Sequence, residues 1–123
     1  MPMGTVASPR QLDLDKLRGA ADQACALLKV MSNPHRLMIL CQLLHGERSV
    51  GELVTLIGLS QSALSQHLAK LRHYRLVATR RQAQTIYYRI ASPEAEAVIA
   101  TLYELYCNHR ADPCTGPLAG VEA

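Results

Sequence analysis

Four cysteines are the residues of this chain best suited to covalent chemistry: Cys25, Cys41, Cys107 and Cys114. Residues 1–10 lack the apolar run of a secretory signal, and no stretch approaches the roughly 18 apolar residues of a membrane span. We therefore expect a cytoplasmic protein, in which thiols stay reduced and a disulfide would be transient or redox-sensing. Residue type alone also allows a plainer role, because free cysteine is among the most buried residues.

A second group of side chains has the types that contact DNA. Glutamine can bond to adenine in bidentate fashion, and serine can bond to several base edges or to phosphate. Arginine and lysine contact the phosphate backbone and fix the position of a protein on the duplex. The candidate contacts are Ser60, Gln61, Ser62, Ser65, Gln66, His67, Lys70, Arg80, Arg81, Gln82 and Gln84.

The charge of the chain is concentrated in this region. From Leu53 to Pro93 there are six Lys and Arg and no Asp or Glu, whereas the remainder holds seven bases and ten acids. The net charge of +3 therefore combines +6 in one segment with −3 elsewhere. A solvated basic surface would be the plain alternative, but it does not explain the missing acids. The pattern indicates a face that binds a polyanion.

The elements that must position these residues follow from hydrophobic periodicity and capping residues. Apolar residues at helical spacing predict helices, and alternating residues predict strands. The fold class we predict is mainly α with a β-hairpin wing, in the order α-α-α-α-β-β-α. The predicted helices are about 13–31, 34–45, 50–57, 61–74 and 93–109, and the predicted strands are 76–81 and 85–91.

The third and fourth helices match a helix-turn-helix at about Leu53–Leu71, with a wing at about Leu76–Ile90. Ser49 and Glu52 form a capping box, and Ser60 caps the reading helix behind Gly58. The wing turn lacks Gly, Asn and Asp, so its type cannot be predicted.

The predicted organisation is a flexible N-terminus at 1–10, one winged helix-turn-helix DNA-binding domain at 11–110 and a flexible tail at 111–123. The first and last helices offer more apolar surface than so small a core needs. We expect them to form a homodimer that binds a two-fold symmetric double-stranded DNA operator. The alternative is that both helices pack only over the core of their own subunit.

The sequence resembles the ArsR family of bacterial transcriptional repressors over about residues 20–107. The resemblance lies in Leu27–Leu37, Ser49–Leu53, Leu59–Leu68 and Thr85–Tyr88. It implies a dimeric repressor that occupies an operator and leaves when a signal binds. One metal motif of the family has Cys-Val-Cys where this chain has Ser49-Val50-Gly51, and another needs Asp and His pairs on the last helix. Neither motif is present, so we expect no metal or other cofactor.

Leu40-Cys41 and Tyr106-Cys107 are similar to the thiol-sensing, persulfide-responsive branch of that family. The resemblance implies that Cys41 and Cys107 are the sensor pair and that reactive sulfur species are the inducer. Spacing cannot show whether the two cysteines are adjacent; a direct disulfide needs Cα atoms within about 7 Å, and a polysulfide would bridge a longer gap. Cys107 is expected in the final turn of its helix, where the macrodipole disfavours a thiolate.

The other two cysteines have plainer interpretations. Cys25 is expected to pack in the apolar stripe of the first helix, and Cys114 to be a bystander in the tail. A repressor that responds to a metal ion or haem is the main alternative, although Cys107, His109 and Cys114 have irregular spacing for a zinc site. A small thiol enzyme is a further alternative, but no His or Arg is evidently placed to activate a cysteine. We therefore expect no enzymatic activity.

Overall fold

The structure is a computed structural model that describes residues 13–108. Its elements follow the order α1 (Leu14–Met31), α2 (Pro34–Leu43), β1 (Arg48–Ser49), α3 (Val50–Ile57), α4 (Gln61–His73), β2 (Val77–Gln82), β3 (Thr85–Ile90) and α5 (Pro93–Tyr103). A π-helical segment, η3 (Glu104–Asn108), continues α5. The helices, the hairpin and their order confirm the predicted fold class.

Local capping explains where most helices begin. The Asn33 side chain accepts hydrogen bonds from the backbone N–H groups of His35 and Arg36, and Pro34 follows at the first helical position. The predicted capping box is formed, with Ser49 and Glu52 each accepting from the other's backbone N–H.

The sequence did not predict the short strand β1. The two-residue strand β1 pairs antiparallel with β3, so the sheet has three strands in the order β1-β3-β2. A strand of two residues carries no readable alternation, and only its pairing with Tyr87 and Tyr88 defines it. The pairing of β1 with β3 joins the wing to the segment that leads into α3.

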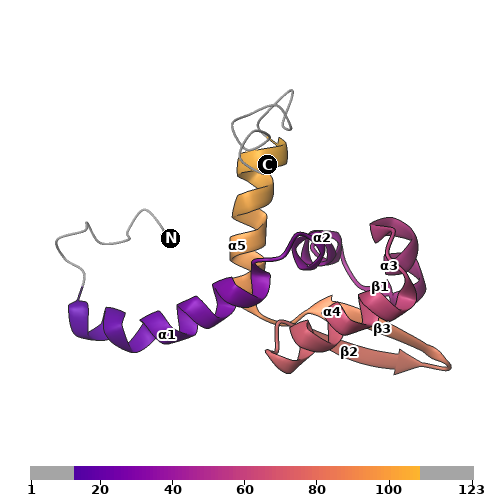
Figure 1. Cartoon of the computed structure of the whole chain (residues 1–123), viewed down its shortest axis with the longest axis horizontal. Helices are drawn as coiled ribbons and strands as arrows, with labels where there is room; N and C mark the ends of the chain where they lie inside the picture. The colour runs from indigo at the N-terminus through magenta and orange to yellow at the C-terminus, as the bar shows by residue number, and fades with distance from the viewer. Residues whose placement is uncertain (1–12, 109–123) are drawn as a thin grey trace.

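The core lies where α2, α3, α4, α5 and the base of the wing meet (Figure 1). Its buried residues are all non-aromatic, as expected for a chain without Phe and Trp, and the partly buried ring of Tyr88 packs against them. The buried residues are Val30, Met31, Ile39, Leu40, Leu43, Leu53, Leu64, Leu68, Leu71, Leu76, Val77, Ala95 and Ile99. Because this core touches α3 and α4 together, it fixes the orientation of the helix-turn-helix.

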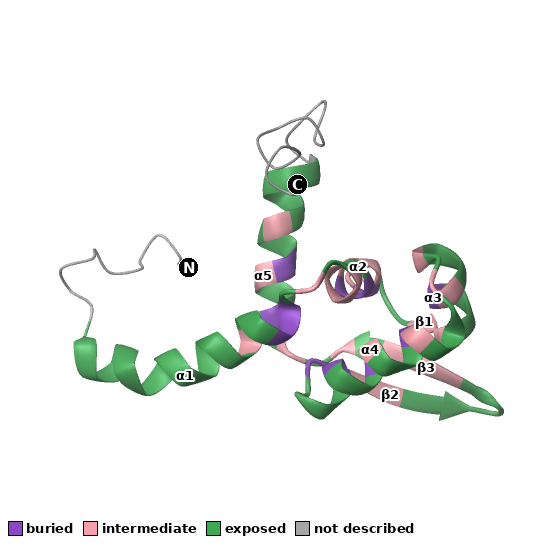
Figure 2. Ribbon diagram, in the orientation of Figure 1, coloured by how far each residue is buried: buried purple, intermediate pink, exposed green. Residues whose placement is uncertain are grey.

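Helix α1 extends away from the core, in the opposite direction to the wing (Figure 1). Only its last two residues, Val30 and Met31, are buried, and the rest of it is exposed apart from half-buried Leu27 (Figure 2). The expectation that Cys25 packs in an apolar stripe is therefore wrong for the single chain, because Cys25 is exposed. The stripe is present in the sequence, but the chain's own core does not cover it.

Candidate nucleic-acid interface and thiol pair

Helix α4 has a buried face and an exposed polar face. Leu64, Leu68 and Leu71 are at most 1% exposed and anchor the helix in the core. The opposite side is solvated and free of acidic residues. Ser60 Oγ caps the helix by accepting from the Ala63 backbone N–H. The exposed predicted contacts at this helix are Ser60, Gln61, Ser62, Ser65, Gln66 and Lys70.

The turn before α4 depends on a glycine. Gly58 ends α3 with φ at +86°, in the left-handed region, and its N–H donates to the Val54 carbonyl. Residues with a Cβ avoid this conformation, so glycine is the default there. The turn sets the angle between α3 and α4 and thereby presents the start of α4 to solvent.

The far end of α4 closes with a Schellman motif. The Leu76 N–H donates to the Leu71 carbonyl and the Arg75 N–H to the Arg72 carbonyl, while Arg75 itself has φ at +65°. An arginine thus occupies a position usually taken by glycine. The motif ends α4 and leads the chain directly into β2, so the reading helix and the wing are joined by one tight connection.

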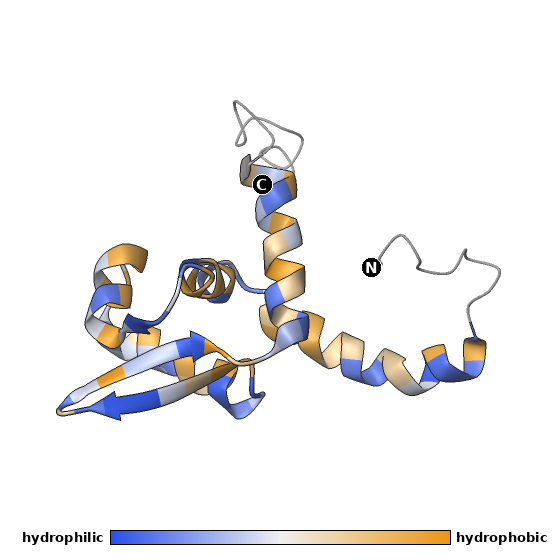
Figure 3. Ribbon diagram, turned by 180° about the vertical axis from the view of Figure 1, so that it is seen from behind, coloured by the Kyte–Doolittle hydropathy of each residue, from blue (hydrophilic) through white to orange (hydrophobic). Residues whose placement is uncertain are grey.

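The wing is polar toward its tip (Figure 3). Arg81, Gln82 and Gln84 are exposed there, as predicted for DNA contacts. The turn at Ala83 and Gln84 contains a non-glycine residue with positive φ, because Ala83 has φ at +57°.

Arg80 differs from the other wing residues because it already has an anionic partner. Its Nε lies 2.8 Å and 3.0 Å from the two carboxylate oxygens of Glu47, and its guanidinium donates to Gln82 Oε1 at 2.8 Å. Its Cζ also lies 4.6 Å from the centre of the Tyr87 ring. Sequence reasoning missed Glu47, since 33 positions separate it from Arg80. A phosphate would have to compete with this carboxylate for the guanidinium.

His67 differs from the other predicted contacts on α4 because it is half-buried. Its Nδ1 lies 3.4 Å from the guanidinium of Arg36, and its ring lies 5.6 Å from that of His35. Burial, followed by the positive charges of Arg36, His35 and Lys70, lowers the pKa of His67. Sequence reasoning missed Arg36, which reaches α4 across 31 positions.

The two predicted sensor cysteines lie on neighbouring helices. Cys41 is half-buried on α2 against the core, and Cys107 is exposed in η3. Burial raises the pKa of the Cys41 thiol, and a second contribution in the same direction comes from the negative charge of Cys107. Helix α2 packs against α5, and the η3 segment that carries Cys107 continues α5.

An aromatic contact brings the ends of these helices together. The rings of His45 and Tyr103 meet edge to face with 6.5 Å between their centres. His45 lies four positions after Cys41, in the turn that follows α2, and Tyr103 lies four positions before Cys107. Sequence reasoning missed both His45 and Tyr103. Among residues 13–108 no cysteine is in a disulfide, and no three His, Cys, Asp or Glu side chains gather as a metal site. His109 and Cys114 lie outside the described residues.

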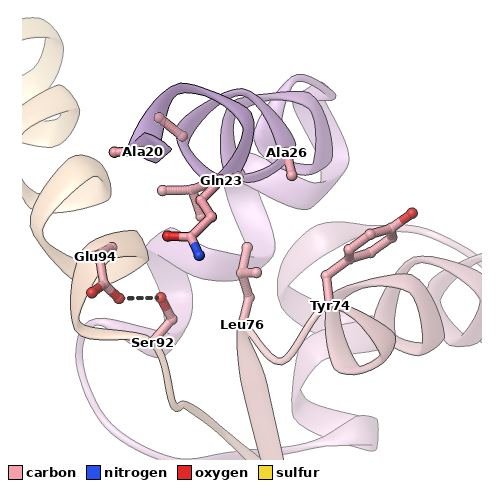
Figure 4. Close-up of a pocket in the computed structure, with 9 residues that line it drawn as sticks. Ala20, Gln23, Ala26, Tyr74, Leu76, Ser92 and Glu94 are labelled. Atoms are coloured by element: carbon pink, nitrogen blue, oxygen red, sulfur yellow. Dashed lines mark hydrogen bonds between the residues drawn. The ribbon is translucent and has the colours of Figure 1, made fainter. Parts of the chain in front are cut away.

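Large apolar side chains are exposed along α1 and in η3. On α1, about half or more of the surface of Leu14, Leu17 and Leu28 is exposed. In η3, about half of the surface of Leu105 and Tyr106 is exposed. A groove of about 510 Å³ lies between α1 and the segments that carry Tyr74, Leu76 and Ser92 (Figure 4). No helix within residues 13–108 is long and apolar enough to cross a membrane.

Comparison with known proteins agrees with this geometry. The family described as bacterial regulatory protein, arsR family, matches residues 33–79. The transcriptional activator HlyU of Vibrio cholerae is 51% identical over 97 residues, which cover 79% of this chain and 90% of that protein. The chain belongs to the ArsR family of bacterial regulatory proteins. It is thus a DNA-binding transcriptional regulator with a winged helix-turn-helix fold.

A second relative and a solved structure of HlyU extend the ArsR-family match. The biofilm growth-associated repressor of Xylella fastidiosa (strain Temecula1) is 41% identical over 104 residues, covering 85% of this chain and 89% of that protein. The structure described as reduced HlyU from Vibrio cholerae superposes with a TM-score of 0.73 at 52% identity, covering 75% of this chain and 97% of that chain. ArsR-family relatives of this chain thus include proteins named as an activator and as a repressor.

Proposed function

We propose that this ArsR-family protein is a homodimeric repressor whose operator binding is switched by oxidation or persulfidation of Cys41 and Cys107. The observation that supports the switch is the placement of the two thiols, Cys41 on α2 and Cys107 in η3, which continues α5, the helix packed against α2. The name of one relative, a repressor, supports the direction of regulation. Because bacterial DNA lies in the cytoplasm, the protein would act there, where thiols stay reduced until a signal arrives.

DNA recognition is assigned to the exposed face of α4 and to the wing. Gln61, Ser62, Ser65 and Gln66 are exposed at the start of α4 and would contact base edges in the major groove. Lys70 and the wing residues Arg81, Gln82 and Gln84 would contact phosphates or the minor groove, and Ser60 a phosphate at the helix start. Arg80 would join them after exchanging Glu47 for a phosphate.

Dimerisation is assigned to α1 and to the end of α5 with η3. Exposed Leu14, Leu17 and Leu28 lie along α1, and exposed Leu105 and Tyr106 lie in η3. A helix that extends from the body with uncovered leucines buries them only against another chain. A two-fold pair of reading helices would then match half-sites about one helical turn of DNA apart.

The first step of the switch is assigned to Cys107. Its thiol is exposed, whereas that of Cys41 is half-buried with a raised pKa and is therefore less nucleophilic at neutral pH. The Cys107 thiolate attacks the central sulfur of hydrogen trisulfide, HS–S–SH, and expels one hydrosulfide ion. The product is a hydrotrisulfide, Cys107–S–S–SH, with the protein sulfur counted among the three.

Cys41 completes the bridge. Its thiolate attacks the middle sulfur of that adduct and expels a second hydrosulfide ion, leaving a trisulfide with one inserted sulfur between the two cysteines. Each thiol loses its proton to the solution when its thiolate forms. The solution pH then decides whether the expelled hydrosulfide ions take up those protons. With hydrogen peroxide as the oxidant, the product is a direct disulfide and water.

The bridge would act through the position of η3. Tying Cys107 to α2 constrains the end of α5, which we assign to the dimer interface, and π-helical turns such as η3 are frequent at functional sites. The bridged form would favour a dimer whose reading helices no longer match the half-site spacing, which is a population shift. That one similar protein was solved in a form described as reduced agrees with a redox-dependent state in the family.

The experiment compares operator release in cysteine variants. A duplex enriched by this protein from a random-sequence pool serves as the DNA, and its binding is followed by fluorescence anisotropy before and after treatment with a polysulfide. Cys41→Ser and Cys107→Ser should bind the duplex but not release it. Cys25→Ser is the matched control, since Cys25 is an exposed thiol on α1, and it should release DNA like the wild type. Full release from either sensor variant would contradict the proposed switch.

A further inference from the structure

Arg36 connects three helices. It lies in the first turn of α2, where its backbone N–H is bound by Asn33. Its Nε donates to the carbonyl of Val30 in the last turn of α1 at 2.6 Å, and its guanidinium lies 3.4 Å from Nδ1 of His67 on α4. One side chain therefore contacts the end of the extended helix α1 and the middle of the reading helix α4.

The contact with His67 depends on protonation. Arginine has N–H donors and no acceptor, so Nδ1 of His67 must be the acceptor. Nδ1 accepts only in the neutral imidazole, because both ring nitrogens of the imidazolium are donors. Protonation of His67 would thus replace the hydrogen bond with repulsion between two cations.

The surroundings of His67 favour the neutral form. The charged groups that act on it are Arg36 and His35 of α2 and Lys70 of its own helix, and each is cationic or can become so. Partial burial has the largest effect, these charges add to it, and together they lower the pKa of His67. The contact is therefore intact at neutral pH and is lost as the pH falls through that lowered pKa.

We propose that the contact between Arg36 and His67 positions helix α4 relative to helix α1, and that acid releases it, weakening operator binding. This inference rests on the DNA-binding function and the dimer proposed above. If α1 joins the two subunits, its angle to α4 sets the separation of the two reading helices. A specific operator requires that separation, whereas non-specific binding through phosphates does not.

A direct contact between His67 and DNA predicts a pH dependence of affinity with the opposite sign. If His67 contacted a phosphate directly, as its residue type first suggested, its protonation would add a positive charge at the DNA. Affinity would then rise as the pH falls. Whether affinity falls or rises in acid therefore shows whether His67 positions α4 or contacts a phosphate directly.

The test measures the affinity for the enriched duplex from about pH 8 to about pH 5.5 at constant ionic strength. The wild type should lose affinity in acid. Because each protomer takes up one proton at His67, the loss should be at most about tenfold per pH unit for each protomer. His67→Gln should show a flat profile, because the amide oxygen of glutamine can accept from Arg36 at every pH. His73→Gln removes an exposed histidine from the same helix and should keep the wild-type profile.

A second variant addresses Arg36 itself. Arg36→Gln should bind weakly at every pH and without pH dependence, with a wild-type circular dichroism spectrum confirming that it is folded. Identical profiles for the wild type and both His67 and Arg36 variants would overturn the inference. An affinity that rises in acid and loses that rise in His67→Gln would also overturn it. If no duplex is enriched from the pool, the specific operator binding on which the inference rests fails, a result distinct from an enriched duplex whose binding has no pH dependence.

Discussion

Replacing Gly58 by alanine tests how the turn of the helix-turn-helix is held. Apart from its two chain neighbours, no residue has a heavy atom within 4 Å of a Cβ added at Gly58, so the substitution causes no clash with packed side chains. Its cost comes from the backbone alone, because φ at this position is +86°. A residue with a Cβ loses roughly 1–2 kcal/mol in the left-handed region. The reduced entropy of the unfolded chain returns about 0.4–1 kcal/mol. We expect Gly58→Ala to destabilise the fold by about 1 kcal/mol.

Gly51 provides a matched control on the same helix. It lies near the start of α3, and an added Cβ would lie 3.9 Å from Ser49 Oγ, an ordinary contact. Because Gly51 has helical geometry, Gly51→Ala should stabilise the fold by about 0.5 kcal/mol. The same chemical change should therefore have opposite signs at the two ends of α3.

Urea denaturation followed by circular dichroism measures both variants at one fixed protomer concentration, because the stability of the proposed dimer would depend on it. With an m value of about 2 kcal/mol per molar urea, the midpoint of Gly58→Ala should fall by about 0.5 M. That of Gly51→Ala should rise by about half as much. The reasoning fails if Gly58→Ala is as stable as the wild type, or if both variants lose the same stability.

Three further predictions concern the wing, the sensor thiol and the core. Glu47→Gln removes the carboxylate that holds Arg80, so DNA affinity should increase and log K against log salt should steepen by about 0.9 per protomer; an unchanged slope would show that Arg80 reaches no phosphate. The raised pKa of Cys41 leaves little thiolate at neutral pH. Iodoacetamide should therefore label it more slowly than exposed Cys25, as peptide mass spectrometry would show, and equal rates would contradict this. Leu64→Ala, at a fully buried site, should cost about 2–5 kcal/mol in the same urea assay, and a loss under 1 kcal/mol would contradict the packing.

The sequence predicts the elements well where the signal is local. Asn33, Ser49 with Glu52, and Ser60 all cap the helices that they were expected to cap, because each reaches a backbone N–H within three residues. Gly58 ends α3 for the same local reason. The polar face of α4 is likewise exposed as predicted, since its opposite face supplies the leucines of the core.

Contacts between distant segments were not predictable. The pairing of β1 with β3, the ion pair of Glu47 with Arg80 and the contact of Arg36 with His67 each join positions more than thirty residues apart. A single sequence gives no sign of which residues meet at such separations. The turn at Ala83 also escaped prediction, because a positive φ at alanine has no signature in residue type.

The cysteines show both what the sequence could predict and what it could not. Cys41 was expected on an apolar face, and it does pack against the core. Cys107 was expected in an ordinary final helical turn, but it lies in a π-helical segment that no hydrophobic period indicates. Cys25 was expected to pack in the apolar stripe of the first helix, but α1 extends from the body (Figure 1), so the core of this chain leaves Cys25 exposed.

The most direct test of the central claim is peptide mass spectrometry of the DNA-free and DNA-bound protein after treatment with a polysulfide. We expect a peptide pair joined through Cys41 and Cys107 with an added sulfur atom, recovered only from protein that has left the enriched duplex. Release from DNA without any link between these two cysteines would contradict the switch. It would leave the ArsR-family regulator in need of a different inducer.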